Sequence, residues 1–180
     1  RHARKAALKQ ADLVILAGVP CDFRLDYGQN IARKAVLVAA NRSEEEMQKN
    51  RSPDVPVLAD AGRFLQALAN KIADGPRRDR GAWVKQLRAA DDARDAEIAG
   101  KAAAASASAE AMVDPLHLFR RIDAALDDNS QMIADGGDFV ATSSYIVRPR
   151  APLSWLDPGV FGTLGVGGGF ALGAKLVRPE

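Results

Sequence analysis

Residues 153 to 175 read LSWLDPGVFGTLGVGGGFALGAK, and this stretch decides what kind of fold the chain can adopt. It runs from a proline-marked loop into a helix of small residues. The glycines of this transition stand at positions 162, 165, 167, 168 and 169. A glycine has no Cβ, so it permits positive φ and lets the backbone approach a bound ligand closely. Amide groups in the first turn of such a helix could face an anion or a polar ring. The alternative is an Ala/Gly helix packed closely on a neighbour.

Two familiar phosphate-binding motifs do not fit this stretch. A dinucleotide fingerprint, Gly-x-Gly-x-x-Gly, should follow a β-branched strand, whereas the glycines here follow PLSWLDPG. A Gly-Lys-Ser/Thr phosphate loop is also absent from the sequence. The residues around the glycines must therefore decide between a cofactor loop and a packed helix.

The bulk properties are those of a soluble globular protein. The 180 residues suffice for one domain, or one and part of another, with 47% hydrophobic and 27% charged residues. The net charge of +2 argues against a nucleic-acid partner, and no apolar run approaches the ~20 residues that span a membrane. A single cysteine, Cys21, excludes an intramolecular disulfide, and we expect a cytoplasmic protein. Because the chain starts at Arg1, we expect a piece of a longer protein.

The first hundred residues predict a parallel α/β sheet. Apolar runs predict strands at 13–17, buried on both faces, and at 35–39, with a weaker strand at 55–60. A loop and a short helix separate the first two strands. Ser43 and Asp60 are placed to cap the helices that follow them, the second of which ends at Gly75-Pro76.

The second half repeats the theme of helix, strand, glycine turn and helix. Residues 80–105 predict a long surface helix, and the Ala/Ser-rich stretch predicts a connector at 101–113. Asp114-Pro115 then starts a helix, with a buried face that we assign to Leu116, Phe119, Ile122, Ala125 and Leu126. The strand QMIAD (131–135) leads into the turn at Gly136-Gly137. We thus predict an α/β chain with a partial central domain (1–100), a connector (101–113) and the start of a second α/β domain (114–180).

Two motifs together identify a family. IADGGDF (133–139) and WLDPGVFGTLGVGGGFALGAKLVRP (155–179) resemble the start of the diphosphate-binding domain of thiamine-diphosphate-dependent enzymes. The likeness is closest to acetolactate synthase-like proteins and 2-hydroxyacyl-CoA lyases. The first half, with ADLVILAGVPCDFRLDYG and DVPVLADAGRFLQAL, looks like the second part of that family's central domain.

The resemblance implies thiamine diphosphate as cofactor and a role for five residues. By similarity, the carbonyl of Gly162 accepts a hydrogen bond from the cofactor's 4′-amino group, and Leu164 supports the bend between its two rings. Thr163 lies between them and could contact the cofactor through its backbone. Gly137 and Asp138 match the turn that meets the diphosphate, where we expect the backbone of Asp138 to matter more than its carboxylate.

The resemblance also implies which parts of the site lie elsewhere. The family's Mg²⁺ ligands would follow residue 180, and its catalytic glutamate would precede residue 1. We therefore expect no catalytic residue and no metal ligand in this chain, and we expect the 180 residues alone to be inactive. In the family the cofactor sits between two subunits, which implies a homodimer or homotetramer for the full-length protein.

A nucleotide in the central domain is a separate question, because some members of the family bind FAD or ADP there. An acidic residue after a strand grips the ribose in those members, whereas Asn41 stands at that place here. This departure argues against FAD or ADP. Gly18 and Arg24 could still contact a nucleotide; their structural alternative is a sheet-edge turn and a surface arginine.

Two substrate classes fit the resemblance. One is the condensation of 2-oxo acids, as in acetolactate synthesis, and the other is the cleavage of a 2-hydroxyacyl-CoA to an aldehyde and formyl-CoA. The sequence of residues 155–167, WLDPGVFGTLGVG, resembles the lyases slightly more than the synthases. A third reading is a non-catalytic interaction or regulatory module that keeps the fold without the chemistry.

Overall fold

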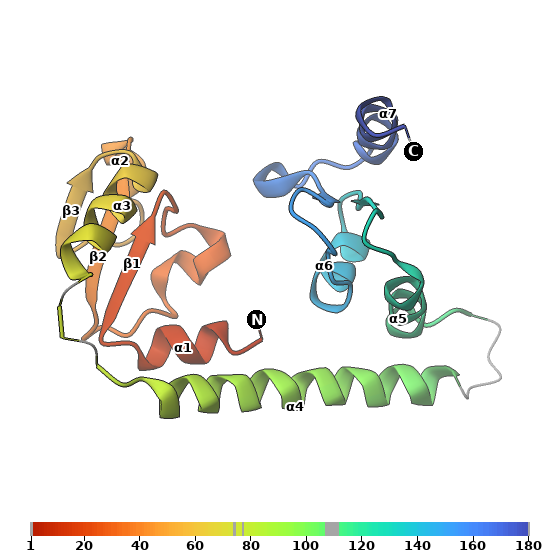
Figure 1. The fold of residues 1–180 in the computed structure, drawn as a ribbon, viewed down its shortest axis with the longest axis horizontal. Helices are drawn as coiled ribbons and strands as arrows, with labels where there is room; N and C mark the ends of the chain where they lie inside the picture. The colour runs from red at the N-terminus through yellow and green to blue at the C-terminus, as the bar shows by residue number, and fades with distance from the viewer. Residues whose placement is uncertain (1, 74, 77, 107–111, 180) are drawn as a thin grey trace. The chain divides into compact units, whose positions relative to one another are not determined.

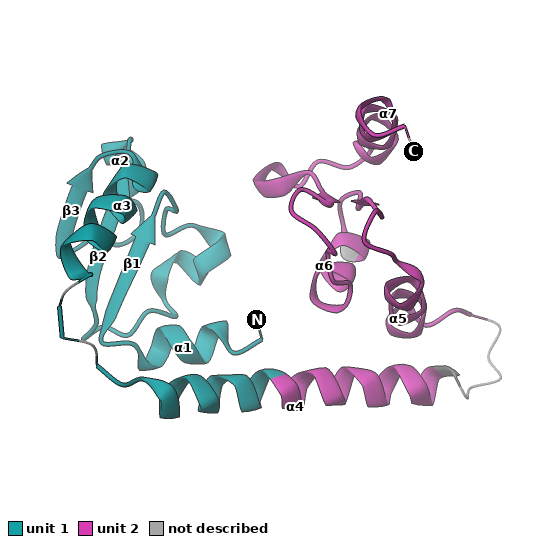
Figure 2. Ribbon diagram, viewed as in Figure 1, with its two compact units in different colours: residues 1–91 teal, residues 92–180 magenta. Residues whose placement is uncertain are grey.

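The computed structural model describes every residue of the chain except 1, 74, 77, 107–111 and 180. These residues form two compact units, 1–91 and 92–180, coloured teal and magenta in Figure 2. The division falls within the long helix α4 (Gly81–Ser106), so that helix supplies residues to each unit. Each unit has its own sheet and its own core.

A parallel three-stranded sheet forms the centre of the first unit. The strands β1 (Leu13–Ala17), β2 (Val36–Asn41) and β3 (Val55–Leu58) lie side by side in that order (Figure 1). Val14 is paired with Leu37, and Val38 with Val55. The predicted parallel α/β sheet is confirmed, although β2 begins one residue later than predicted and extends to Asn41.

Before α4, the first unit contains α1 (Arg4–Gln10), the 3-10 segment η1 (Phe23–Gly28), α2 (Glu44–Gln48) and α3 (Ala61–Ile72). Two of these, α2 and α3, start where the sequence predicts their caps. The hydroxyl of Ser43 accepts from the Glu46 amide at 3.2 Å, and the Asp60 carboxylate accepts from the Arg63 amide at 2.9 Å. Both predicted caps are confirmed.

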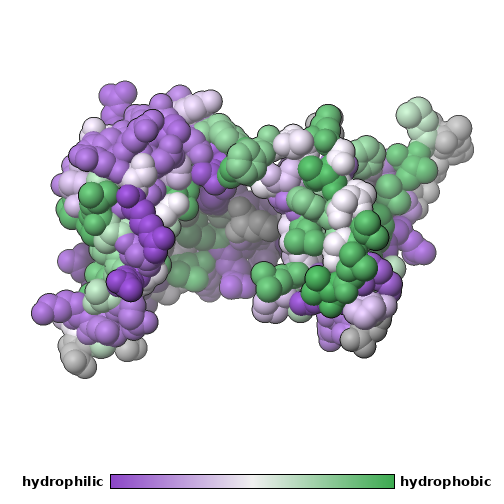
Figure 3. Space-filling model, turned by 90° about the horizontal axis from the view of Figure 1, so that it is seen from above, coloured by the Kyte–Doolittle hydropathy of each residue, from purple (hydrophilic) through white to green (hydrophobic). Residues whose placement is uncertain are grey.

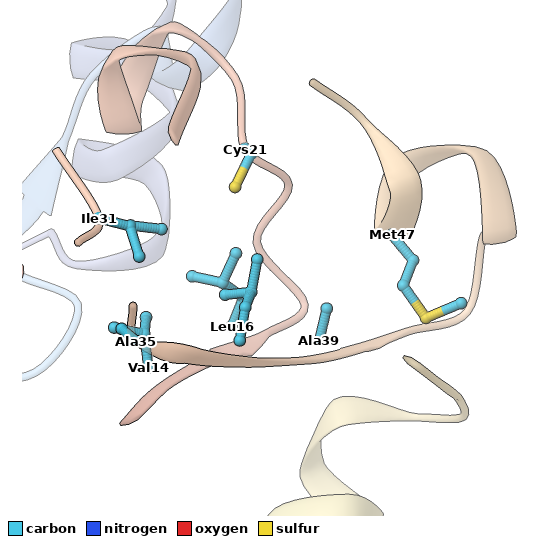
Figure 4. Close-up of a cluster of buried hydrophobic side chains, with 8 residues drawn as sticks. Val14, Leu16, Cys21, Ile31, Ala35, Ala39 and Met47 are labelled. Carbon is cyan, nitrogen blue, oxygen red and sulfur yellow. The ribbon is translucent and has the colours of Figure 1, made fainter. Parts of the chain in front are cut away.

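One face of the sheet carries the core of the first unit. Apolar side chains from β1 and β2 meet others from α2 and the intervening loops (Figure 4); the buried set is Val14, Leu16, Cys21, Ile31, Ala35, Leu37, Ala39 and Met47. The prediction that β1 is buried on both faces is wrong. Leu13 and Ile15 point to the opposite face and are exposed, as is Val36 beside them, because the described residues do not cover that part of the sheet. Figure 3 shows hydrophobic residues at the surface of the molecule.

The second unit is built on a short pair of parallel strands. After α4 come α5 (Pro115–Ala125), β4 (Met132–Ile133), α6 (Asp138–Ile146), β5 (Trp155–Leu156), the 3-10 turn η2 (Gly159–Phe161) and α7 (Gly167–Val177). β4 pairs with β5, which the sequence did not predict as a strand. Asp114 caps α5 as predicted, since its carboxylate accepts from the His117 amide at 3.0 Å.

The core of the second unit gathers side chains from three helices. Ile98 of α4, Phe119 of α5 and Ile146 of α6 are buried together with Val147. The predicted buried face of α5 is therefore confirmed, since Phe119 is buried and Leu116, Ile122 and Leu126 pack against the same core. Ala125, the last residue of the helix, is exposed instead. α4 remains helical through Ser106, so residues 101–106 of the predicted connector are helical. Residues 107–111 of that connector lie outside the described residues.

No helix among the described residues combines the length and the apolar character that crossing a membrane requires.

Candidate functional site

The two glycine turns singled out by the sequence meet at one edge of the strand pair. Gly136 and Gly137 follow β4, and the tripeptide Gly162–Leu164 follows η2. A Cβ at Gly136 would lie 2.7 Å from Cδ2 of Leu164 and 3.0 Å from the carbonyl oxygen of Thr163. Only glycine permits so close an approach. Residues 137 and 162–164, about 25 positions apart in sequence, are thereby brought into one site.

Positive φ angles shape both turns. Gly137 precedes α6 with φ 87°, and Gly162 ends η2 in the left-handed region with φ 58° and ψ 22°. Glycine adopts these conformations without the steric cost that other residues meet. The sharp turns expected from the glycines are confirmed at these positions.

In the tripeptide, the Leu164 side chain and the Gly162 carbonyl group are open to a ligand. Leu164 is 70% exposed, with its Cδ2 turned toward Gly136 and Gly137. Within the described part of the chain, the Gly162 carbonyl accepts no hydrogen bond. The tripeptide is therefore not sealed inside a packed core.

Asp135, which we did not select from the sequence, links the two turns. The amide of Gly165 donates to its Oδ1 at 2.9 Å, and the amide of Gly167 donates to its Oδ2 at 3.3 Å. The amide of Gly136 also donates to Oδ1, at 2.7 Å. These backbone donors, Gly136 foremost, hold the pKa of the Asp135 carboxyl below its usual value. The available signal was an acidic residue between a short strand and a Gly-Gly turn.

The Asp135 carboxylate occupies the place where we expected an anion, at the first turn of α7. We expected free amides in the first turn of α7 to face an anion, but Asp135 already accepts from Gly167 there. By contrast, Gly137 at the N-terminus of α6 offers no capping side chain, and the first amides of a helix lack partners within it. An anion is therefore better placed at α6, where the backbone of Asp138 begins the helix.

These features fit thiamine diphosphate. The α6 N-terminus supplies donors for a diphosphate, the glycine cradle keeps Cβ atoms away, and the Gly162 carbonyl is an acceptor for an amino group. No group of three or more His, Cys, Asp or Glu side chains in the described residues could hold a metal ion.

Two aromatic residues flank the site. Trp155 packs against the core of the second unit, and its indole Nε1 donates to the Asp157 carboxylate at 2.7 Å. Phe161, in η2, is exposed. Behind them an apolar groove of about 400 Å³ runs between β5 and α7, lined by Leu156 and Phe170 among others. The tripeptide Gly162–Leu164 does not line this groove.

The candidate nucleotide residues of the first unit are engaged within the protein. Gly18 follows β1 with φ 73°, and its amide donates to the carbonyl of Ala40, next to Asn41. Oδ1 of Asn41 accepts from the Ser43 amide at 3.1 Å. The guanidinium of Arg24 forms a two-pronged ion pair with Asp22, with distances of 2.7 to 3.1 Å. The structure thus brings Gly18 and Asn41 to one sheet edge and directs Arg24 to a local carboxylate.

Comparisons with known proteins cover both units. The model of the thiamine pyrophosphate enzyme central domain matches residues 1–68, and that of the C-terminal TPP binding domain matches residues 135–180. The chain is 47% identical over 184 residues to 2-hydroxyacyl-CoA lyase 2 of Caenorhabditis elegans and 44% identical over 186 residues to that of Homo sapiens. It is 33% identical over 185 residues to the acetolactate synthase large subunit IlvG of Mycobacterium tuberculosis.

These alignments include all, or nearly all, of the chain but a minor part of each relative. The whole chain aligns with 28% of either lyase, and 99% of it aligns with 31% of the synthase. The chain thus spans less than a third of the length of these relatives. The two domain matches, at residues 1–68 and 135–180, together with the relatives, establish the assignment. The chain belongs to the thiamine pyrophosphate enzymes and carries parts of their central and C-terminal domains.

Proposed function

We propose that these residues belong to a thiamine-diphosphate-dependent lyase that cleaves a 2-hydroxyacyl-CoA into an aldehyde and formyl-CoA. The observation that carries the proposal is the contact between the Gly136 turn and the tripeptide Gly162–Leu164. That contact supports a cofactor role for both segments, because a Cβ in the cradle would displace the tripeptide.

Each residue of the site has a role in holding the cofactor. The Gly162 carbonyl would accept from the 4′-amino group, Leu164 would pack under the bend between the rings, and Thr163 would offer its backbone. Gly137 and the backbone of Asp138 would bind the diphosphate at the N-terminus of α6. When bound, thiamine diphosphate would supply a carbon nucleophile for addition to a carbonyl and a thiazolium ring that accepts the electron pair of the bond broken next to it.

The degree of identity supports the lyase over the synthase. Identity is 47% to a relative named as a 2-hydroxyacyl-CoA lyase and 33% to one named as an acetolactate synthase. Condensation of 2-oxo acids is therefore the second candidate. Both names describe enzymes, which favours catalysis over a non-catalytic module.

The remaining parts of the proposal concern the full-length protein. We propose that it binds Mg²⁺ through residues outside this chain and assembles as a homodimer or homotetramer. We place it in the cytoplasm, a proposal supported by a sequence with one cysteine. We do not propose FAD or ADP as a ligand of the first unit. Asn41 accepts from Ser43, and Arg24 is paired with Asp22.

The test uses the full-length protein, titrated calorimetrically with thiamine diphosphate in the presence of Mg²⁺. We expect saturable binding, release of formyl-CoA and an aldehyde from a 2-hydroxyacyl-CoA, and little acetolactate from pyruvate. Acetolactate as the main product would transfer the assignment to the synthase. Absence of thiamine diphosphate binding would refute both candidates.

The 180 residues alone provide a negative arm. We expect them to form neither product, because the family's catalytic glutamate would lie outside them. Measurable acyloin formation by this chain would contradict that expectation.

A further inference from the structure

The structure assigns Asp135 a role as a positioning residue: its carboxylate holds the coenzyme tripeptide Gly162–Leu164 in shape from the α7 side. The inference rests on the proposed cofactor role of that tripeptide. It concerns a residue that sequence reasoning did not select.

The geometry places the carboxylate directly after the tripeptide. Oδ1 accepts from the amide of Gly165, the next residue, at 2.9 Å, and Oδ2 accepts from the amide of Gly167 at 3.3 Å. Oδ1 also accepts from Gly136 at 2.7 Å. One half-buried side chain therefore ties the β4 turn to a segment 30 to 32 residues further along the chain.

The segment that Asp135 holds has little else to order it. Gly165 has φ 85°, and a Cβ added there would meet nothing within 4 Å; the same is true of a Cβ at Gly162. Glycine loses more conformational freedom on folding than any other residue, so an acceptor from another element is needed to fix it. At the other end of the tripeptide, the Gly162 amide donates to the Gly159 carbonyl at 3.3 Å.

The chemistry of the site requires a carboxylate. An ionised aspartate has two oxygens and only accepts hydrogen bonds, whereas asparagine would turn an NH₂ donor toward one of the amides. A negative charge is also stabilising at the N-terminus of α7. The carboxylate satisfies that helix end, which leaves the N-terminus of α6 as the place for the diphosphate.

A tripeptide fixed before binding need not be ordered by the cofactor. Ordering a loop on binding lowers affinity, so loss of the clamp should weaken cofactor binding without removing any direct contact. Asp135 would therefore act on binding indirectly, unlike residues that touch the cofactor.

The experiment compares Asp135→Asn and Asp135→Ala in the full-length protein with a matched control, Asp114→Ala. Asp114 also caps a helix, α5, through a carboxylate that accepts from a backbone amide at 3.0 Å, but it lies outside the proposed site. Two quantities are measured: the Kd for thiamine diphosphate with Mg²⁺, and hydrogen exchange of backbone amides in the cofactor-free protein.

We expect Asp135→Ala to raise the Kd roughly tenfold or more, in line with the loss of charged hydrogen bonds. Exchange at Gly165 and Gly167 should speed up in the cofactor-free protein, with Asp135→Asn intermediate in both measurements. Asp114→Ala should speed exchange in the first turn of α5 and leave the Kd unchanged.

An unchanged Kd in a folded Asp135 variant with faster exchange at Gly165 would overturn the positioning role. Unchanged exchange at Gly165 and Gly167 would overturn the clamp itself. If Asp135→Ala fails to fold, Asp135→Asn decides the matter alone. Failure of the wild-type protein to bind thiamine diphosphate would instead refute the proposed function, while the exchange measurement still tests the clamp.

Discussion

The strand β1 in the first unit and the strands β4 and β5 in the second all lead into glycine turns, but the polar groups around these turns are used differently. In the first unit, Asn41 and Arg24 are engaged with Ser43 and Asp22. In the second unit, the Gly162 carbonyl accepts no hydrogen bond within the described residues, and α6 has no capping side chain. A strand followed by a glycine turn is therefore not enough to predict a ligand site. What matters is whether the turn leaves donors and acceptors open.

The strongest test of the open site is Gly136→Ala. The added methyl group would lie 2.7 Å from Cδ2 of Leu164 and 3.0 Å from the Thr163 carbonyl oxygen, so the Leu164 side chain must turn away and the Thr163 carbonyl must shift slightly. Overpacking of this kind costs about 1–3 kcal/mol, and we expect the Kd for thiamine diphosphate to rise about 10- to 100-fold. Calorimetric titration of the full-length protein measures it.

Gly173→Ala is the matched control for that change. Gly173 lies inside α7, and a Cβ there would meet nothing within 4 Å. Replacing a helical glycine by alanine stabilises by roughly 0.5–1 kcal/mol, so this variant should be slightly more stable and bind as the wild type does. If Gly136→Ala and Gly173→Ala bound thiamine diphosphate equally well, the turn at Gly136 would not be part of an open ligand site. The contrast with the closed turn of the first unit would then be lost.

Leu164→Ala separates cofactor contact from folding. Leu164 is 70% exposed, so its loss should change the free energy of unfolding of the cofactor-free protein by less than about 0.5 kcal/mol. If the cofactor buries this side chain, the Kd should rise by about tenfold, in keeping with ~1.5–3 kcal/mol for a fully buried leucine.

The control for Leu164 is Leu172→Ala in α7, where the leucine is 65% exposed. We expect both variants to unfold at the same denaturant concentration and only Leu164→Ala to lose affinity. An equal loss of affinity in both variants would mean that Leu164 makes no particular contact with the cofactor.

Replacement of Gly162 by alanine or by asparagine tests the left-handed turn. The backbone at Gly162 has φ 58° and ψ 22°, with open space around a Cβ, so the cost of alanine is conformational. That cost is about 1–2 kcal/mol, and asparagine should lose less because it tolerates this region. Denaturant unfolding of the two variants gives the comparison; equal stability would contradict the assigned backbone conformation.

The smallest effect is expected in the first unit, from Arg24→Ala. The Arg24 side chain in its ion pair with Asp22 is 38% exposed to water, so we expect a loss of less than about 1 kcal/mol in the free energy of unfolding. The Arg24 side-chain hydrogen bond lowers the pKa of Asp22 below 3.8. The contribution is therefore complete above pH 3.8 and is lost as the pH falls through the lowered value.

Stability curves of wild type and Arg24→Ala should accordingly converge at low pH. A difference that persists in acid would show that the arginine acts through something other than this pair. Binding of FAD or ADP by the wild-type protein, lost in Arg24→Ala, would contradict our view of the first unit.

Local signals in the sequence predicted much of the fold. The capping residues Ser43, Asp60 and Asp114 each lie three residues before the amide that they accept from, so short-range chemistry suffices to place them. The strand 13–17 was predicted with its observed bounds, since a short apolar run that ends at a glycine depends little on distant residues.

Features that depend on distant pairing were missed. β5 consists of Trp155 and Leu156, which become a strand only through pairing with β4. The carboxylate that accepts from the first amide of α7 belongs to Asp135, 32 residues before Gly167, and spacing within the helix cannot reveal it. Burial of β1 was overestimated for a similar reason. An apolar pattern shows which faces can be covered, and only tertiary structure shows which ones are.

Cys21 gives the first unit an internal reporter. It is 3% exposed in the core around Ile31 and Leu37, and burial raises the pKa of its thiol. Because thiolate and access are both needed for alkylation, a thiol reagent should label this residue only when that core opens. No other cysteine occurs in the 180 residues, so the rate of labelling would time the opening of the first unit without interference from the second.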